Sequence, residues 1–225
     1  MSRLYLLLGG LVLAGSLAHA DTSYAFSTTV SYTGSGTIDT SGTCTANSVN
    51  AESAIYCVDF ADTSGTTNYV LAYAPNNGSG TAAFPPGTGD NFGYFQVFCE
   101  VAGSSTMSTG CLHATFTGDV TITVHQTTPD VASGNFVDVL SGGYSNVSTG
   151  TAVITFSTTT FDLGATPLQY SLQPGGAYDL NHVSTNNDSS IQGTITDETA
   201  PEPGTLATMG VGLLAAGLAA RRKRS

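Results

Sequence analysis

The central part of this 225-residue sequence has no lysine and no arginine. The five basic residues all lie near the ends of the chain: Arg3, Arg221, Arg222, Lys223 and Arg224. Of the 16 acidic residues only Glu202 lies outside residues 21–200, so that span carries 15 acids and a formal charge of −15. Nucleic-acid binding needs cations that displace counterions from phosphates, so this composition excludes it. Arginine clamps on carboxylates and Schiff-base lysines are excluded for the same reason.

The common catalytic motifs are also missing. The sequence has no His-Glu-x-x-His zinc motif, no Gly-x-Ser-x-Gly nucleophile elbow and no glycine-rich phosphate loop. Tryptophan, a frequent stacking partner of sugars, is absent altogether. We therefore expect that the protein is not an enzyme. The remaining catalytic alternative is a secreted glycoside hydrolase, for which Asp59 and Glu100 are the candidate acids.

Residues 1–20 have the features of a secretory signal peptide. Arg3 supplies the positive start, residues 4–17 form an apolar run, and Ala18 and Ala20 form a small-x-small cleavage site. The apolar run is short for a membrane-spanning helix, and no charged stop follows it. We expect the export machinery to move the chain across the inner membrane and signal peptidase to cleave after Ala20.

The C-terminal end carries a second targeting segment. Pro201, Glu202 and Pro203 precede an apolar stretch over 204–220, which is at the lower length limit for a membrane-spanning helix. The basic cluster at 221–224 follows as a stop signal that stays on the cytoplasmic side. The two prolines keep the segment extended, and therefore accessible to an enzyme.

This tail resembles a PEP-CTERM protein-sorting signal, with the motif at 201–203, the helix at 204–220 and the basic end at 221–224. The resemblance covers residues 199–225 and carries no information about the rest of the chain. It implies a Gram-negative bacterium that makes an exopolysaccharide matrix. It also implies a membrane-embedded exosortase that recognises the motif, removes the tail and releases the protein to the cell surface or the extracellular matrix.

Residues 21–198 are expected to form one all-β domain, an antiparallel β-sandwich or jelly roll. Apolar residues alternate with threonine and serine, the period of a half-buried strand, over 24–32, 112–124, 152–156 and 191–195. Two segments, 54–61 and 94–101, are apolar on both faces and are predicted as central strands. Segment 69–74 is predicted as a weaker strand. Thr-rich outer faces and Gly/Asn turns fit this fold better than a disordered stalk.

Cys44, Cys57, Cys99 and Cys111 are an even number of thiols in a chain expected to enter an oxidising compartment. We therefore expect two disulfides. Three connectivities are possible, and the spacing favours Cys44–Cys57 with Cys99–Cys111. A zinc site is the alternative, although the sequence has no Cys-x-x-Cys pair.

Oxygen-rich segments offer candidate ligands for Ca²⁺, with solvated turn residues as the competing interpretation. The candidate ligands are Asp90, Asp130, Asn135, Asp138 and Asp188. None of these segments matches an EF-hand or an RTX repeat. His113 and His125 share the polar face of segment 112–124, and only a hairpin around Gly118 would bring them close enough to bind a metal. Otherwise they are surface histidines.

The sequence thus predicts an exported, exosortase-processed surface or matrix protein with a structural or adhesive role. The first alternative is a polysaccharide-binding module, which would need tyrosines exposed together on one sheet face. The tyrosines considered for that face are Tyr24, Tyr32, Tyr73, Tyr94 and Tyr144. The second alternative, the hydrolase, would need two acids in a cleft.

Overall fold

The fold is described from a computed structural model of the chain. The structure describes residues 22–38, 48–49, 52–53, 56–82, 87–104, 106–165, 167–173, 176–180, 189–198 and 212–213. The chain divides into two units, of which one is Thr22–Asp197 and the other joins Met1–Asp21 with Glu198–Ser225. The predicted signal peptide at 1–20 lies outside the described residues, as does the predicted membrane helix at 204–220 except for Gly212 and Leu213, which are helical. Within the described ranges, no helix has the length and apolarity needed to cross a membrane.

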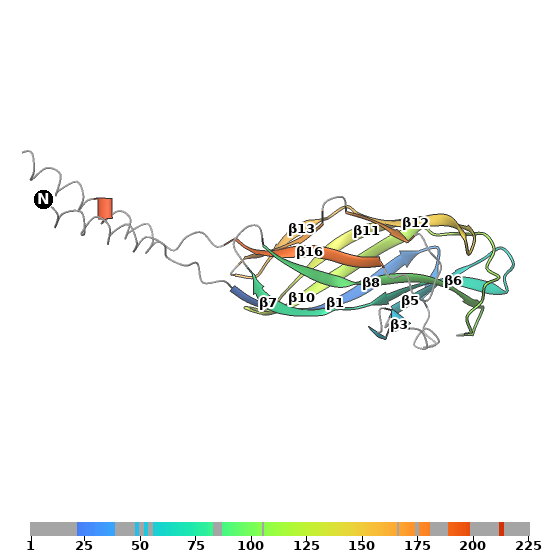
Figure 1. The fold of residues 1–225 in the computed structure, drawn as a ribbon, viewed down its shortest axis with the longest axis horizontal. Helices are drawn as coiled ribbons and strands as arrows, with labels where there is room; N and C mark the ends of the chain where they lie inside the picture. Colours follow the sequence, from blue (N-terminus) through green and yellow to red (C-terminus); the bar gives the residue numbers. More distant parts are fainter. Residues whose placement is uncertain are drawn as a thin grey trace, which may run out of the picture. The chain divides into compact units, whose positions relative to one another are not determined.

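The unit Thr22–Asp197 is built from β-strands (Figure 1). The strands of its first half are β1 (Thr22–Gly34), β2 (Thr37–Ile38), β3 (Ser48–Val49), β4 (Glu52–Ser53), β5 (Tyr56–Ala61), β6 (Thr67–Ala74), β7 (Asn77–Ala82) and β8 (Thr88–Val101). The strands of its second half are β9 (Ala114–Thr115), β10 (Gly118–Thr128), β11 (Ala132–Asn146), β12 (Thr149–Phe156), β13 (Thr160–Leu163), β14 (Leu168–Leu172), β15 (Ala177–Leu180) and β16 (Ser189–Asp197).

Two antiparallel sheets contain most of these strands. The first, sheet A, has the order β15-β12-β11-β10-β1-β7, and β9 also pairs with β11. The second, sheet B, has the order β13-β14-β16-β8-β6-β5-β2, while β3 and β4 form a separate hairpin. The prediction of an all-β domain with antiparallel sheets is confirmed.

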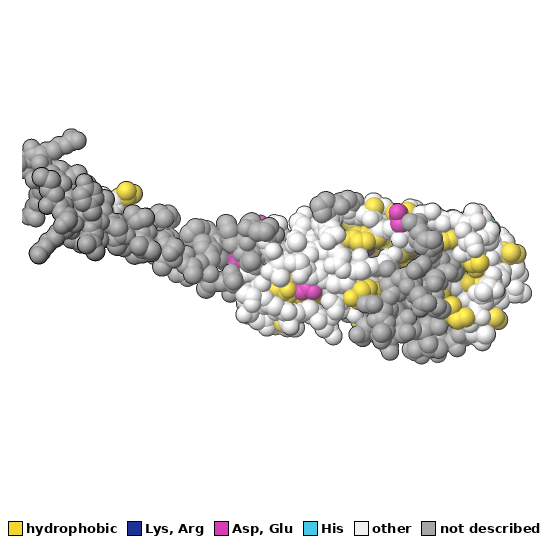
Figure 2. Space-filling view, viewed as in Figure 1, with side chains coloured by type: hydrophobic (Ala, Val, Ile, Leu, Met, Phe, Trp, Pro, Cys, Tyr) yellow, Lys and Arg dark blue, Asp and Glu magenta, His cyan; other side chains and the backbone are white. Residues whose placement is uncertain are grey.

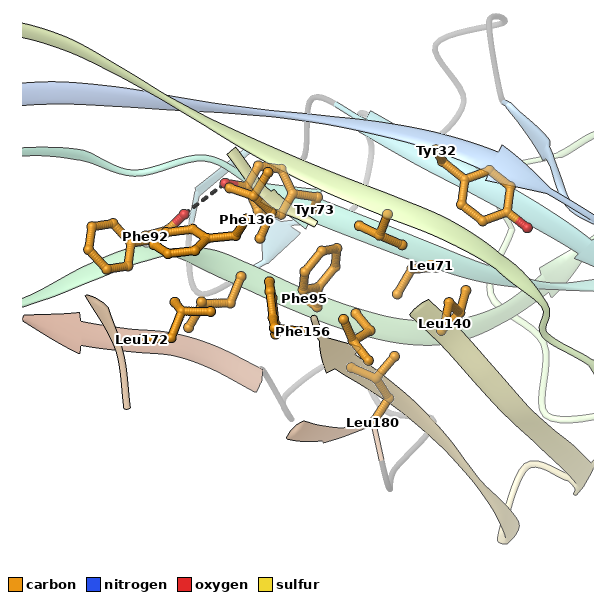
Figure 3. Close-up of a cluster of buried hydrophobic side chains, with 14 of the residues drawn as sticks. Tyr32, Leu71, Tyr73, Phe92, Phe95, Phe136, Leu140, Phe156, Leu172 and Leu180 are labelled. Carbon is orange, nitrogen blue, oxygen red and sulfur yellow. Dashed lines mark hydrogen bonds between the residues drawn. The ribbon is translucent and has the colours of Figure 1, made fainter. Parts of the chain in front are cut away.

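The main core lies between the two sheets and is rich in aromatic rings. Strand alternation produces it, since β1 and β10 turn their apolar residues inward and most of their threonines outward, with buried Thr28 as an exception. Figure 3 shows Phe136 of sheet A close to Phe92 of sheet B, and their ring centroids are 5.4 Å apart. In the same view the Tyr73 hydroxyl donates a hydrogen bond to the carbonyl oxygen of Phe92, 2.8 Å away. Such ring pairs contribute about 0.5–1.5 kcal/mol each beyond the burial of apolar area.

A second apolar cluster covers part of the outer face of sheet B. Val70, Ala72 and Ala74 of β6 pack there with Cys57 and Phe98. Strand β3 contacts both β6 and β8, so the β3–β4 hairpin lies over this side of the sheet. This second layer explains why parts of sheet B are apolar on both faces.

The two segments predicted as central strands correspond to β5 and β8, and they differ in position. β8 is at the middle of sheet B, but β5 is next to the edge strand β2. The prediction of a central position is therefore wrong for β5, of whose outer face only Cys57 belongs to the second cluster. β6, predicted as a weak strand, is buried at nearly every position between Thr67 and Ala74.

Segment 112–124, which the alternation left as either one strand or a hairpin around Gly118, is neither of these, because it is interrupted. β9 ends at Thr115 and pairs with β11, whereas β10 begins at Gly118 and lies between β1 and β11. Between them the Phe116 amide donates to the carbonyl oxygen of Gly142, and the Thr117 carbonyl accepts a hydrogen bond from the Ser35 amide. The apolar alternation continues across this break, so the sequence pattern does not reveal it.

Candidate functional site

The residues that carry the targeting predictions lie outside the described ranges. They are Ala18, Ala20, Pro201, Glu202, Pro203, Arg221, Arg222, Lys223 and Arg224. Within the domain, the Thr22 hydroxyl donates a hydrogen bond to the Asp197 carboxylate. This contact joins the first residue of β1 to the last residue of β16, so the two ends of the domain lie next to each other.

One of the two predicted disulfides is confirmed. Cys99, near the end of β8, is bonded to Cys111, three residues before β9, with a Cα–Cα distance of 5.9 Å. Cys57 is also disulfide-bonded. Its predicted partner, Cys44, lies outside the described residues. The Cys99–Cys111 bond closes the loop that leads from sheet B to sheet A.

Hydrogen bonds to the Asp62 side chain connect the β5–β6 turn to the loop between β8 and β9. Its Oδ1 accepts hydrogen bonds from the Ser64 amide at 2.9 Å, the Ser64 hydroxyl at 2.6 Å and the Gly65 amide at 3.1 Å. Its Oδ2 accepts from the Thr67 hydroxyl at 2.5 Å and the Leu112 amide at 2.8 Å. Burial alone would raise the pKa of Asp62, but the hydrogen bonds from Ser64, Thr67 and Leu112 lower it to about 2.

Our sequence reasoning missed Asp62, although a local signal is present. Asp62-Thr63-Ser64-Gly65 has the composition of a turn in which the aspartate side chain binds the backbone two residues later. The contact to Leu112 has no such signal, because it joins residues that are 50 positions apart.

The outward face of sheet A carries a continuous array of hydroxyl groups. Thr29 lies opposite Thr123 and Ser31 lies opposite Thr121 on β1 and β10. The next strand, β11, adds the exposed side chains of Val137 and Val139. We define the hydroxyl face as Thr29, Ser31, Thr33, Thr121, Thr123, Val137, Val139 and Thr155, all exposed or half-buried. Lysine and arginine do not occur in this part of the chain. Exposed Asp119, opposite Thr33 and Val139, and exposed Asn135, opposite Thr123, lie on the same side of the sheet, so hydroxyl and methyl groups share it with one acid and one amide.

The tyrosines considered for sugar stacking are not exposed on one face. Tyr24, Tyr32, Tyr73 and Tyr144 are buried in the core between the sheets. Tyr94 is half-buried and packs against the second cluster on sheet B. These five residues therefore do not form the aromatic platform that the polysaccharide-binding alternative would need. Alternation places a tyrosine on one of two faces, and only the packing of the sheets decides which face is inside.

The predicted calcium ligands do not converge. Asp90, on β8, accepts a hydrogen bond from the Tyr24 hydroxyl at 2.7 Å. Asp130, in the β10–β11 turn, accepts from Gln126 Nε2 at 2.9 Å and from the Ala165 amide at 2.6 Å. In the described ranges, no group of three or more His, Cys, Asp or Glu side chains is arranged to hold a metal ion.

Asn135 and Asp138, two of the candidate calcium ligands, lie in a strand and not in a loop. β11 begins at Ala132, so only residues 129–131 form the turn. Asn135 points outward and Asp138 points into the core, which prevents the two side chains from sharing an ion in a loop site. The fifth candidate, Asp188, lies outside the described residues.

His113 and His125 are far apart. His113 precedes β9, which pairs with β11 at Gly143, whereas His125 pairs with β11 at Ser133. Ten residues of strand separate these two positions, a distance of about 33 Å. The hypothesis of a metal-binding histidine pair is wrong, because β9 and β10 do not form a hairpin with each other. Instead, His125 contacts the hydroxyls of Thr29 and Ser133 at 3.0 Å each.

The two acids considered for glycoside hydrolysis lie on the outer face of sheet B. Asp59 of β5 is opposite Val70, and Glu100 of β8 is opposite Asn68, so β6 separates them. The backbones of β5 and β8 are therefore about 10 Å apart. Glu100 is buried, and a substrate does not reach its carboxyl group in this fold.

A family model described as the PEP-CTERM protein-sorting motif matches residues 199–224. A search of curated proteins and a search of solved structures each found no match to the chain. The motif indicates an exosortase-dependent exported surface protein that is anchored in the membrane before it is cleaved. The chain thus combines a PEP-CTERM sorting signal with an all-β domain, Thr22–Asp197, that the family model does not cover.

Proposed function

We infer that this protein is a structural or adhesive component of the cell surface or extracellular matrix of a Gram-negative bacterium. In this proposal, a signal peptide at 1–20 directs export, and the helix at 204–220 holds the chain in the inner membrane. An exosortase then removes the tail at Pro201-Glu202-Pro203 and releases a β-sandwich domain. The observation that carries the proposal is the sorting-motif match at residues 199–224.

The composition of the domain supports a role outside the cell. Proteases that cleave after lysine or arginine have no site between residues 4 and 220, because neither residue occurs there. On the face drawn in Figure 2, acidic side chains are scattered and no basic side chain is visible among the described residues. The Cys99–Cys111 disulfide adds stability in an oxidising compartment.

Deleting the exosortase gene in the native host tests the sorting proposal. We expect the full-length protein to stay in the inner membrane and to disappear from the surface and matrix fractions. A chain in which Pro201, Glu202 and Pro203 are all changed to alanine should behave in the same way in the unmodified host. A matched control changes exposed Ser145, Ser148 and Thr149 to alanine and should be released normally. Unchanged release after exosortase deletion would contradict the proposal.

A second candidate function, polysaccharide binding, is favoured by the hydroxyl face. Its six hydroxyl side chains donate and accept hydrogen bonds without carrying charge, and its two valines add apolar contact area, which suits a neutral polysaccharide. An anionic polymer would be repelled by the 15 acids of residues 21–200. We expect Thr121→Glu, which lies between Ser31 and Val137 at the centre of this face, to weaken co-sedimentation with a neutral insoluble polysaccharide at least tenfold. Thr109→Glu, exposed in the loop before Cys111, is the control, and equal weakening by both would exclude the hydroxyl face as the site.

A further inference from the structure

Asp138 is a carboxylic acid inside the main core. It lies on β11 between Phe136 and Leu140, at an inward position of the strand, and its side chain is 0 % exposed. The neighbouring strands place Val120 of β10 and Phe156 of β12 directly opposite. The immediate surroundings of this carboxyl group within sheet A are therefore aliphatic and aromatic.

Neither carboxyl oxygen of Asp138 has a hydrogen-bond partner in the described part of the chain. Buried Asp62 is the opposite case, because five donors surround its two oxygens. Buried polar groups are nearly always hydrogen-bonded in folded proteins, and an unpaired buried carboxylate is costly. The fold therefore disfavours the charged form of Asp138.

The ionisable groups near Asp138 do not compensate a negative charge. Two tyrosines interact with it electrostatically, Tyr73 from β6 of sheet B and Tyr178 from β15 of sheet A. Both are neutral at pH 7, since burial raises the pKa of Tyr178 to about 12 and raises that of Tyr73 further above its ordinary value. β10 and β12 contribute no ionisable group at the positions opposite Asp138. The absence of lysine and arginine between residues 4 and 220 removes the side chains that usually pair with a buried acid.

We propose that Asp138 is a proton-dependent switch in the core: the folded domain holds this carboxyl group in its protonated form, and loss of the proton loosens the packing between the two sheets. A neutral carboxylic acid is compatible with an apolar site. A charged carboxylate between Val120 and Phe156 is not compatible with such a site. Deprotonation of Asp138 therefore favours separation of the two sheets, which admits water or a cation to the carboxylate.

The direction in which stability changes with pH follows from the number of protons bound by the folded and the unfolded chain. Burial raises the pKa of Asp138 to about 9, whereas an unfolded aspartate titrates near about 4. Below about pH 4 both states hold the proton, and this group makes no pH-dependent contribution. Between about pH 4 and 9 the folded protein keeps the proton that the unfolded chain has released, so stability falls as the pH rises.

Thermal unfolding of the full chain in a neutral detergent, measured from pH 5 to pH 9, tests this proposal. The unmodified protein should lose thermal stability steadily as the pH rises. Asp138→Asn, which has nearly the same shape but does not ionise, should remove most of that loss and reduce proton release on unfolding at pH 7 by about one proton. Asp119→Asn is the matched control, since it removes an exposed acid from neighbouring β10, and it should keep the loss.

A spectroscopic readout separates protonation from general stability. The infrared spectrum of the folded protein at pH 7 should contain the carbonyl stretch of a protonated carboxylic acid, and Asp138→Asn should abolish it while Asp119→Asn does not. If Asp138→Asn fails to fold, Asp138→Val, which matches the adjacent Val120, takes its place in both measurements. The proposal is overturned if the variant keeps the pH slope of the unmodified protein or if the carboxylic-acid band does not depend on Asp138.

Discussion

The backbone amide of Leu112 donates a hydrogen bond to Oδ2 of Asp62 over 2.8 Å, although the two residues are 50 positions apart. Asp62 lies in the turn between β5 and β6 of sheet B. Leu112 lies in the loop two residues before β9 of sheet A. The neighbouring Cys99–Cys111 disulfide closes the same loop. One buried carboxylate and one covalent bond thus connect the two sheets at the end of the domain where β8 finishes.

Replacing Asp62 tests this connection. Asp62→Ala leaves five donors without their acceptor and should lower the free energy of unfolding at pH 7 by about 2–3 kcal/mol. Because hydrogen bonds lower the folded pKa of Asp62 to about 2, its contribution is present above about pH 4 and disappears as the pH falls through about 2. Denaturant unfolding at pH 7 and at pH 2 should therefore show a large difference from the unmodified protein only at pH 7.

The exposed residue Asp119 provides the control for this experiment. Asp119→Ala removes an acid of the same charge from a solvent-facing position on β10, and its effect at pH 7 should stay within about 0.5 kcal/mol. Equal destabilisation by Asp62→Ala and Asp119→Ala would mean that the hydrogen bonds of Asp62 are not the cause.

Removing the Cys99–Cys111 disulfide should destabilise the domain by about 3 kcal/mol, because the bond restricts the unfolded chain over a 12-residue separation. The double variant Cys99→Ala/Cys111→Ala is preferable to chemical reduction, which would also break the disulfide of Cys57. Urea unfolding of the oxidised full chain measures the change. A loss below about 1 kcal/mol would show that the loop is held mainly by Asp62.

The Tyr170 hydroxyl donates a hydrogen bond across the core to Gln126 Oε1 at 3.0 Å, and so connects β14 of sheet B to β10 of sheet A. Tyr170→Phe leaves a buried amide oxygen without its donor and should cost about 1–3 kcal/mol. Gln126→Leu also removes the Nε2 hydrogen bond to Asp130, so the comparison is made within that background, where Tyr170→Phe should cost less because no buried amide oxygen loses its donor. A double-mutant cycle from urea unfolding measures the coupling, and strictly additive losses would contradict it.

Proteolysis is expected to distinguish the folded domain from the unfolded chain at Glu100. This residue is 1 % exposed on β8, so a protease that cleaves after glutamate should leave it intact in the folded protein. The same protease should cut there in urea. Trypsin is the control, because it has no site between residues 4 and 220 in either state. Rapid cleavage after Glu100 without denaturant would contradict the burial of this strand.

Much of the strand content was predictable because half-buried strands alternate with a period of two. The pattern located β1, β10 and β12 and gave the correct inward residues, such as Ile122 and Ile154. It did not separate β9 from β10, since alternation continues through Phe116 and Thr117 while the hydrogen-bonding partner changes. Strand pairing is a non-local property, and periodicity within one segment contains no information about it.

The candidate site was less predictable for a related reason. Asp138 lies in the segment Phe136-Val137-Asp138-Val139-Leu140, where apolar residues occupy both faces, so the pattern does not show which face is inside, and β11 turns Asp138 inward. The polysaccharide-binding alternative would have needed five tyrosines together on a surface, and four of them form part of the core. Alternation states that two residues share a face, but only the partner sheet decides which face is covered.

The sequence by itself determined where the basic residues lie, the sorting motif at 199–224 and the all-β character of the body, because composition, short motifs and strand periodicity are local properties. Only the tertiary structure decided that Asp62 is surrounded by donors while Asp138 has none among the residues that the structure describes. Both are aspartates in an acidic chain, and their different pKa values result from which strands and turns pack around them. Burial and hydrogen bonding depend on contacts between distant segments, which form only when the two sheets come together.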